Sequence, residues 1–149
     1  MAMKTVLNWK QNMQFTATSD GNSILMDGKA PIGHNTGMTP KELVVAGIGG
    51  CTAMDVIALL KKHKQETQTM TIEVDVDSTT GKHPAVFTEA RIVFDVTGGV
   101  DANILMESVR LSQTKFCGVS AMLSKAFPIK YIVKLNGQEI GQGQAEFTE

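Results

Sequence analysis

Residues 39–62, with the sequence TPKELVVAGIGGCTAMDVIALLKK, open a predicted helix that continues to about residue 64. Thr39 is an acceptable N-cap, and Pro40 suits the first helical position. Apolar side chains surround the helix almost completely between Leu43 and Leu60, a pattern typical of a buried helix. The basic residues 61–64 suit the negative end of the helix dipole. The sequence therefore predicts a long, buried helix here.

Strands are expected on both sides of this helix. Before it, apolar and polar residues alternate from Met13 to Ala17, and Asp20-Gly21-Asn22 is a turn signal. Residues 28–38 have the Gly, Pro and Asn content of a loop. After the helix, clean alternation predicts strands at residues 70–76 and 86–96.

The last third of the chain predicts a second helix and a further strand. The helix runs from about Asp101 to Phe127, and a break near its start is left open. The strand covers Ile129 to Leu135 and ends at Asn136-Gly137, a hairpin turn, while the tail QGQAEFTE, residues 142–149, has only marginal structure. Strands, helix, two strands, helix and strand predict one α+β domain over residues 1–149.

Composition narrows the class of protein. The 149 residues are 42% hydrophobic, and a chain of this length buries roughly 70% of its unfolded surface, enough for a core. The net charge of −1 gives no overall attraction to nucleic acids or anionic membranes. The apolar stretch Leu43 to Leu60 is interrupted by Asp55 and glycines, and the N-terminus lacks the features of a signal peptide. We therefore expect a soluble, cytoplasmic protein with no nucleic-acid or membrane partner.

Two cysteines, Cys51 and Cys117, carry the chemistry that the sequence suggests. The helical stripe of Cys51 includes Met54 and Asp55. The stripe of Cys117 is small and polar, and it comprises Arg110, Gln113, Thr114, Ser120, Ala121 and Ser124. Apolar side chains between residues 116 and 127 lie on another side of that helix and account for its packing. Cys117 is therefore not expected to be an ordinary core cysteine.

If the two cysteine faces meet, the glycines at positions 47, 49 and 50 bring the Cα atoms within the ~4.4–6.8 Å that a disulfide needs. A redox couple of Cys51 and Cys117 is then one hypothesis, and a crowded helix crossing without chemistry is the other. An antiparallel crossing also predicts an ion pair between Asp55 and Arg110. The alternative is that Asp55 caps a kink and Arg110 is a solvated surface residue.

A metal site is the weakest hypothesis at this stage. Both cysteines would have to combine with one of the three histidines, His34, His63 or His83. No Cys-x-x-Cys or His-x-x-x-His spacing supports such a site. We therefore expect no metal and no cofactor.

Two segments resemble a known family. The first is the helix quoted above, with Gly-Gly-Cys at its first cysteine, and the second is KFCGVSAMLSKAFPIKY, residues 115–131. Both are similar to the cysteine segments of the OsmC/Ohr family, most closely of its YhfA-like branch, and the resemblance covers essentially the whole chain. It implies an intertwined α+β homodimer with two long central helices per chain, wrapped by antiparallel sheets.

The resemblance also implies an activity. Family members reduce organic hydroperoxides with thiols alone and serve in antioxidant stress responses. Carried over, Cys51 is the peroxidatic residue that becomes a sulfenic acid, and Cys117 is the resolving residue that forms the disulfide, which a dithiol reductant then opens.

The chain departs from the pattern of the characterised peroxidases at two places. Their glutamate ten residues before the first cysteine corresponds to Lys41 here, with Glu42 one step later. Their N-terminal arginine has no counterpart before Arg91, although Lys10 could supply a charge. The alternative function is therefore a redox sensor or small-molecule-binding protein with little turnover, its apolar ligand lying against Met38, Met54 and Met122.

Overall fold

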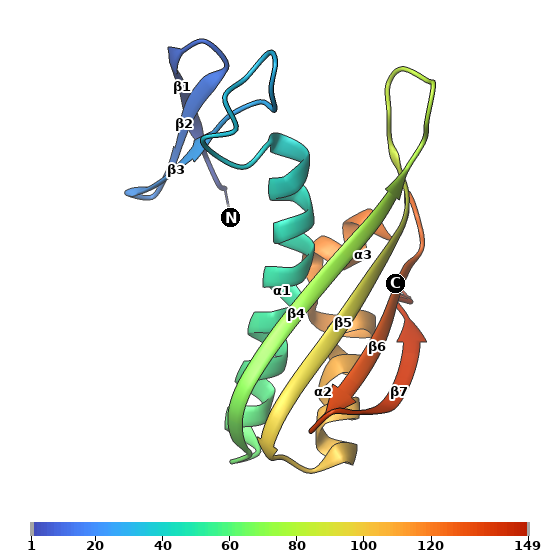
Figure 1. Cartoon of the computed structure of the whole chain (residues 1–149). Coiled ribbons are helices and arrows are strands. Elements are labelled where there is room, and N and C mark those ends of the chain that lie inside the picture. The colour runs from blue at the N-terminus through green and yellow to red at the C-terminus, as the bar shows by residue number, and fades with distance from the viewer. Residues whose placement is uncertain (1, 149) are drawn as a thin grey trace. The chain divides into compact units, whose positions relative to one another are not determined.

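Three short strands form an antiparallel sheet near the N-terminus in the computed structural model, which describes residues 2–148 (Figure 1). They are β1 (Val6–Gln11), β2 (Gln14–Ser19) and β3 (Asn22–Met26), in that order across the sheet. Asp20 and Gly21 join β2 to β3 with φ angles of 49° and 79°, as a two-residue hairpin of type I′ requires. The predicted strands and turn are confirmed. This sheet belongs to a compact unit that ends at Val44, and the residues from Val45 on form a second unit.

A buried carboxylate organises the loop that follows β3. Asp27 accepts hydrogen bonds from the amides of Gly28 (2.7 Å), His34 (3.2 Å) and Thr36 (3.1 Å), and from the Thr36 hydroxyl (2.6 Å). These bonds, that of the Thr36 hydroxyl first, lower the pKa of Asp27 to about 2. The loop from residue 28 onwards is thus held by one ionised side chain.

The long helix α1 (Pro40–Lys62) begins with a reciprocal cap. The Thr39 amide donates to Glu42 Oε1 (2.9 Å), and the Glu42 amide donates to Thr39 Oγ1 (3.2 Å). Further along, every fourth side chain is fully buried: Ile48, Thr52, Val56 and Leu60. The helix therefore presents one regular buried face, whereas the sequence predicted a helix that is buried nearly all round.

A four-stranded sheet forms the body of the second unit, with helices covering one of its faces (Figure 1). The strands are β4 (Glu66–Ser78), β5 (Phe87–Gly99), β6 (Ile129–Leu135) and β7 (Gln138–Gln144), in that order. The α+β class is confirmed. The sheet is mixed rather than antiparallel throughout, because β5 and β6 are parallel and the chain crosses between them through helices.

Strand β7 follows the predicted turn at Asn136-Gly137 and ends within the tail, residues 142–149, where the sequence predicted only marginal structure. Its residues, QEIGQGQ, are polar and rich in glycine, so strand propensity gives no signal. Tertiary packing explains why glycine is needed there, because a Cβ at Gly143 would lie 2.5 Å from Tyr131 Cζ. The turn Asn136-Gly137, with φ angles of 50° and 84°, sets up the hairpin between β6 and β7.

The second helical region is not one helix. It comprises α2 (Ala102–Leu111), a π-helical segment η1 (Ser112–Phe116) and α3 (Gly118–Leu123). The break falls at Cys117, in the middle of the region and not near its start. There the backbone is extended, with φ −74° and ψ 101°, and the Cys117 amide donates to the Ser112 carbonyl (2.8 Å). The prediction of a helix through residue 117 was therefore wrong.

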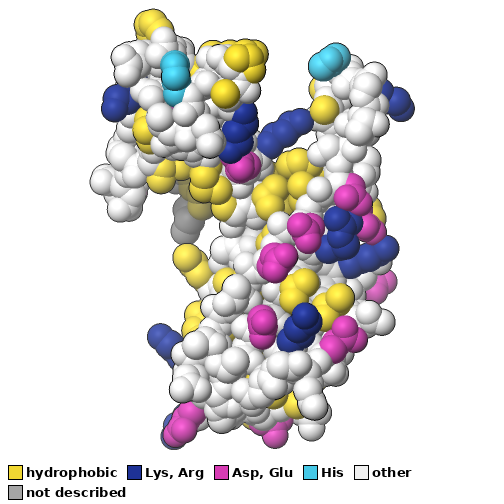
Figure 2. All heavy atoms as spheres, in the orientation of Figure 1, with side chains coloured by type: hydrophobic (Ala, Val, Ile, Leu, Met, Phe, Trp, Pro, Cys, Tyr) yellow, Lys and Arg dark blue, Asp and Glu magenta, His cyan; other side chains and the backbone are white. Residues whose placement is uncertain are grey.

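Much of the apolar surface of α1 has no cover within the described chain. The helix meets the length and composition criteria of a membrane-spanning helix, with mean hydropathy 2.1, although core helices of globular proteins meet them too. Only 28% of that window is buried, and the side chains of Val44 and Met54 are exposed. By contrast, acidic and basic side chains intermingle on the visible face of the four-stranded sheet (Figure 2).

Candidate active site

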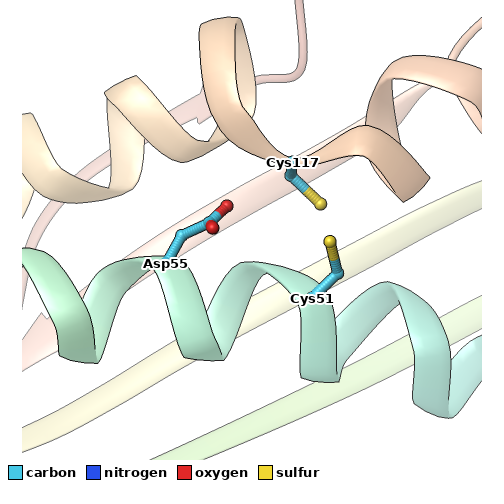
Figure 3. A group of neighbouring side chains, drawn as sticks. All are labelled: Cys51, Asp55 and Cys117. Carbon is cyan, nitrogen blue, oxygen red and sulfur yellow. The ribbon is translucent and has the colours of Figure 1, made fainter. Parts of the chain in front are cut away.

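The two cysteines face each other within the second unit, together with Asp55 (Figure 3). The two Sγ atoms and a carboxylate oxygen of Asp55 all lie within 4.8 Å of one another. Cys51 and Asp55 are one turn apart on α1, and Cys117 lies between η1 and α3. The expectation that the cysteine faces meet is therefore confirmed.

The close approach at the cluster does not depend on glycines in the way the sequence suggested. Gly49 contacts the four-stranded sheet, where a Cβ would lie 3.0 Å from Val74 Cγ2. A Cβ at Gly47 or Gly50 would have no other heavy atom of the described residues within 4 Å, apart from its chain neighbours and the backbone of its own helix. At Cys117, whose sulfur approaches α1, the backbone is extended.

Asp55 is oriented by a chain of hydroxyl groups and not by an arginine. Ser112 Oγ donates to Asp55 Oδ2 (2.9 Å), and Thr52 Oγ1 lies 2.6 Å from Ser112 Oγ. A serine hydroxyl has one proton, so Thr52 is the donor to Ser112 when Ser112 donates to Asp55. Thr52 and Ser112 are both buried, so water does not compete for these two hydrogen bonds.

Both arginines of the protein are engaged elsewhere. Arg110 Nε donates to Glu107 Oε2 (2.8 Å) on the surface of α2. Arg91 pairs with Asp77 and Glu89 on the sheet. The predicted pair of Asp55 and Arg110 was therefore wrong, because the π-helical segment changes the helical phase between residue 110 and Cys117.

The environment of the two sulfur atoms differs. Cys117 is fully buried, whereas Cys51 is partly exposed. Burial raises the pKa of the Cys117 thiol to about 11, and the neighbouring Cys51 adds to this increase, while hydrogen bonding from Ser120 offsets part of it. The Ser120 amide donates to Cys117 Sγ at 3.4 Å, so the cysteine also serves as the N-cap of α3. Cys117 is thus held as a neutral thiol at neutral pH.

Three other candidate residues, Lys10, Lys41 and Glu42, belong to the first unit, whereas the cysteine cluster belongs to the second. Glu42 takes part in the helix cap and forms an ion pair with Lys29 (3.2 Å). Glu42 therefore has a structural role at the start of α1.

The methionines and histidines are exposed. The side chains of Met38, Met54 and Met122 are 44%, 73% and 65% exposed, so they do not enclose an apolar ligand within either unit. His34, His63 and His83 are exposed as well. In the described residues, the third potential metal ligand beside the cysteines is Asp55 and not a histidine.

Sequence reasoning gave no functional role to four buried polar residues of the helices that carry the cysteines: Thr52, Ser112, Gln113 and Ser120. All four are fully buried. The side-chain amide of Gln113 and the side-chain hydroxyl of Ser120 make no hydrogen bond within the described chain. A buried polar group without a partner costs about 1–3 kcal/mol. The available signal was weak: Thr52 is a hydroxyl residue within an apolar helix, and Gln113 and Ser120 lie on the small polar stripe of Cys117.

Comparison with known proteins identifies the family. The family model described as OsmC-like protein matches residues 33–132, which include both cysteines. The chain belongs to the OsmC family. Protein YhfA of Escherichia coli K12, at 33% identity over 138 residues, covers 87% of this chain and 95% of its own length.

Solved structures have the same OsmC fold. A hypothetical protein from Aquifex aeolicus VF5 is 25% identical and superimposes with a TM-score of 0.80 over 100% of this chain and 99% of its own. An organic hydroperoxide resistance protein from Elizabethkingia anophelis is 17% identical, with a TM-score of 0.66 over 91% of this chain and 97% of its own. The predicted relationship to the OsmC/Ohr proteins is confirmed.

Proposed function

We propose that this OsmC-family chain reduces organic hydroperoxides, with Cys51 as the peroxidatic residue and Cys117 as the resolving residue. The observation that carries the proposal is the close approach of a partly exposed sulfur and a buried one. A peroxide has to reach the first sulfur, whereas the second has to meet only the sulfenic acid that forms on the first. The name of the Elizabethkingia anophelis structure supports the same class of substrate.

The proposed reaction has three balanced steps. The Cys51 thiolate attacks the outer oxygen of the hydroperoxide, which breaks the O–O bond and gives a sulfenic acid and, after protonation, an alcohol. The Cys117 sulfur then attacks the Cys51 sulfur, and a disulfide and water are formed. An external dithiol reduces this disulfide and becomes a disulfide itself.

Asp55 has a role in the second step. The Cys117 thiol must lose its proton as it attacks, and its burial opposes the loss. A carboxylate oxygen of Asp55 lies within 4.8 Å of that sulfur, and Ser112 holds the carboxylate in place. Asp55 is thus the proton acceptor that this geometry supports, directly or through one water molecule.

A second candidate function is a redox sensor that is oxidised once and turns over slowly. The observation that favours it is the lack of an ion pair to Asp55 within residues 2–148, which leaves a carboxylate beside Cys51 without a compensating cation. A neighbouring negative charge does not help to form the thiolate that attacks a peroxide. Steady-state turnover with a dithiol separates the two functions.

We also propose a homodimer in the cytoplasm, where dithiol reductants are available. Large apolar side chains are exposed in the first unit: Val6, Leu7, Trp9, Met13, Phe15 and Ile24. The strand register puts Leu7, Trp9, Phe15 and Ile24 on one face of the three-stranded sheet. Exposed apolar surface of this kind is typical of an interface. Sedimentation equilibrium tests the proposal, and a species with the mass of one chain at all concentrations would contradict it.

Thiol titration tests the enzymatic proposal directly. One equivalent of cumene hydroperoxide should consume both thiols of the reduced protein, and a dithiol should restore them. Cys117→Ser should stop at a sulfenic acid that dimedone traps, whereas Cys51→Ser should not react faster than a free thiol. Two titratable thiols remaining after excess hydroperoxide would overturn the proposal, and one oxidation without turnover would favour the sensor.

A further inference from the structure

The cluster of Cys51, Asp55 and Cys117 has the donor set of a metal site. All three ligand atoms lie within 4.8 Å of one another. Two of them belong to α1, and the third, that of Cys117, follows Asp55 by 62 positions in the sequence. From this arrangement we propose that the reduced protein binds Zn²⁺ through these three side chains, with the fourth position open to water or an added ligand. The inference goes beyond the proposed peroxidase chemistry and requires only that both thiols are reduced.

The donor chemistry selects the metal. Zinc binds thiolate sulfur at about 2.3 Å and carboxylate oxygen at about 2.0–2.2 Å in a tetrahedron, which places the ligands roughly 3.5–3.8 Å from one another. Contraction by about 1.3 Å or less would therefore suffice to close the site from separations within 4.8 Å. Magnesium and calcium bind oxygen ligands only, so they are not expected here.

The carboxylate is held by the surrounding residues before any metal arrives. Ser112 donates to Asp55 Oδ2 (2.9 Å), and Ser112 is itself paired with Thr52 (2.6 Å). Hydrogen bonds of this kind orient carboxylate ligands and are often worth 10–100-fold in metal affinity. Cys51 and Asp55 are one helical turn apart, so these two ligands lie on the same face of α1.

Metal binding and disulfide formation exclude each other. When Zn²⁺ binds, both thiols lose their protons, so about two protons are released for each metal ion bound. A disulfide has no thiolate left to bind zinc. An organic hydroperoxide that oxidises the zinc form therefore consumes two protons, gives the disulfide, one alcohol and one water, and releases Zn²⁺. The bound metal should slow this oxidation, because a thiolate that shares an electron pair with zinc is a weaker nucleophile than a free thiolate.

The test uses the full-length reduced protein without metal. Cobalt should bind with one ion per chain and show thiolate-to-cobalt charge-transfer absorption, and zinc should displace it with the release of about two protons. Cys51→Ser and Cys117→Ser should abolish stoichiometric binding. Ser112→Ala should weaken it about tenfold, and Asp55→Asn should weaken it further. Asp75→Asn, which changes an exposed carboxylate on β4, is the matched control and should bind as the unaltered chain does.

Protein of the natural sequence whose thiols have been oxidised or alkylated should bind no cobalt. This measurement does not depend on the folding of a variant. Unchanged binding after thiol modification, binding without charge-transfer absorption, or a similar affinity for Mg²⁺ would overturn the zinc site. A separate assay of the metal-free protein with cumene hydroperoxide keeps the two proposals distinct. Zinc binding without peroxide reduction would refute only the peroxidase, and the reverse result would refute only the metal site.

Discussion

Ser112 donates its hydroxyl proton to Asp55, 57 positions earlier in the chain, over 2.9 Å. This bond joins the π-helical segment to α1 beside the two cysteines, and it takes the place of the arginine that the sequence suggested. Because Thr52 is in turn paired with Ser112, a single buried hydroxyl holds two polar groups of α1.

Removal of that hydroxyl should lower the stability of the fold. Ser112→Ala leaves the buried Thr52 hydroxyl without its partner, so we expect the free energy of unfolding to fall by about 1–3 kcal/mol. Urea denaturation measures this change. Ser124→Ala, at a less buried position, should cost less than about 0.5 kcal/mol. Equal effects of the two substitutions would show that the buried hydroxyl chain has no special importance.

Replacement of the carboxylate tests the proton acceptor. Asp55→Asn should slow disulfide formation from the sulfenic acid roughly 100-fold, because the amide does not accept the Cys117 proton. Rapid mixing with cumene hydroperoxide, followed by dimedone trapping, should detect a sulfenic acid that persists. Asp75→Asn serves as the control and should close its disulfide at the original rate. A normal closing rate in Asp55→Asn would remove Asp55 from the mechanism.

Arg110 should matter little. Its pair with Glu107 is about half exposed on both sides, and such pairs contribute about 0–1 kcal/mol. Arg110→Gln should therefore leave the thiol reactions unchanged and shift the urea midpoint only slightly. A loss of peroxide reactivity comparable to that of Cys51→Ser would instead mean that Arg110 acts on the cluster.

Asp27 should make the first unit sensitive to acid. Its pKa falls from 3.8 to about 2 on folding, so its contribution to stability is complete above about pH 4 and is lost as the pH falls through about 2. Urea unfolding can be followed by the fluorescence of Trp9, the only tryptophan. The unaltered protein should lose stability more steeply over this pH range than Asp27→Asn does. Asp20→Asn should keep the original slope. Parallel curves for Asp27→Asn and the unaltered protein would contradict this role.

Much of the site was predictable from periodicity, since the one-turn spacing of Cys51 and Asp55 gives a shared face on a regular helix. For Cys117, the sequence suggested only that its side of the second helical region meets that face of the first helix. The extended backbone at Cys117 depends on how the segment packs, because the surrounding residues are compatible with a continuous helix. The wrong partner for Asp55 has the same origin, since counting two regular turns from Arg110 to Cys117 ignores the π-helical segment.

Strand β7 shows a different limit. Most strands of the fold follow from alternation of apolar and polar residues, as β5 does. In β7, a Cβ at Gly143 would overlap the buried ring of Tyr131, and a Cβ at Gly141 would displace the flexible end of the Met106 side chain. Those neighbours are distant in the sequence, so local propensity does not reveal the strand.

The π-helical segment makes the length of the chain before Cys117 less critical than its length in a regular helix. It fits one more residue into its turn than an α-helix does. Removing one residue from a regular α-helix rotates the following chain by about 100°, so a deletion between Cys51 and Asp55 would turn these two side chains away from each other. Removing one residue between positions 112 and 116 would instead allow the wide turn to become an ordinary one, with little rotation of the chain that follows. When relatives are aligned, a gap of one residue in this short stretch is therefore compatible with the same pair of facing cysteines.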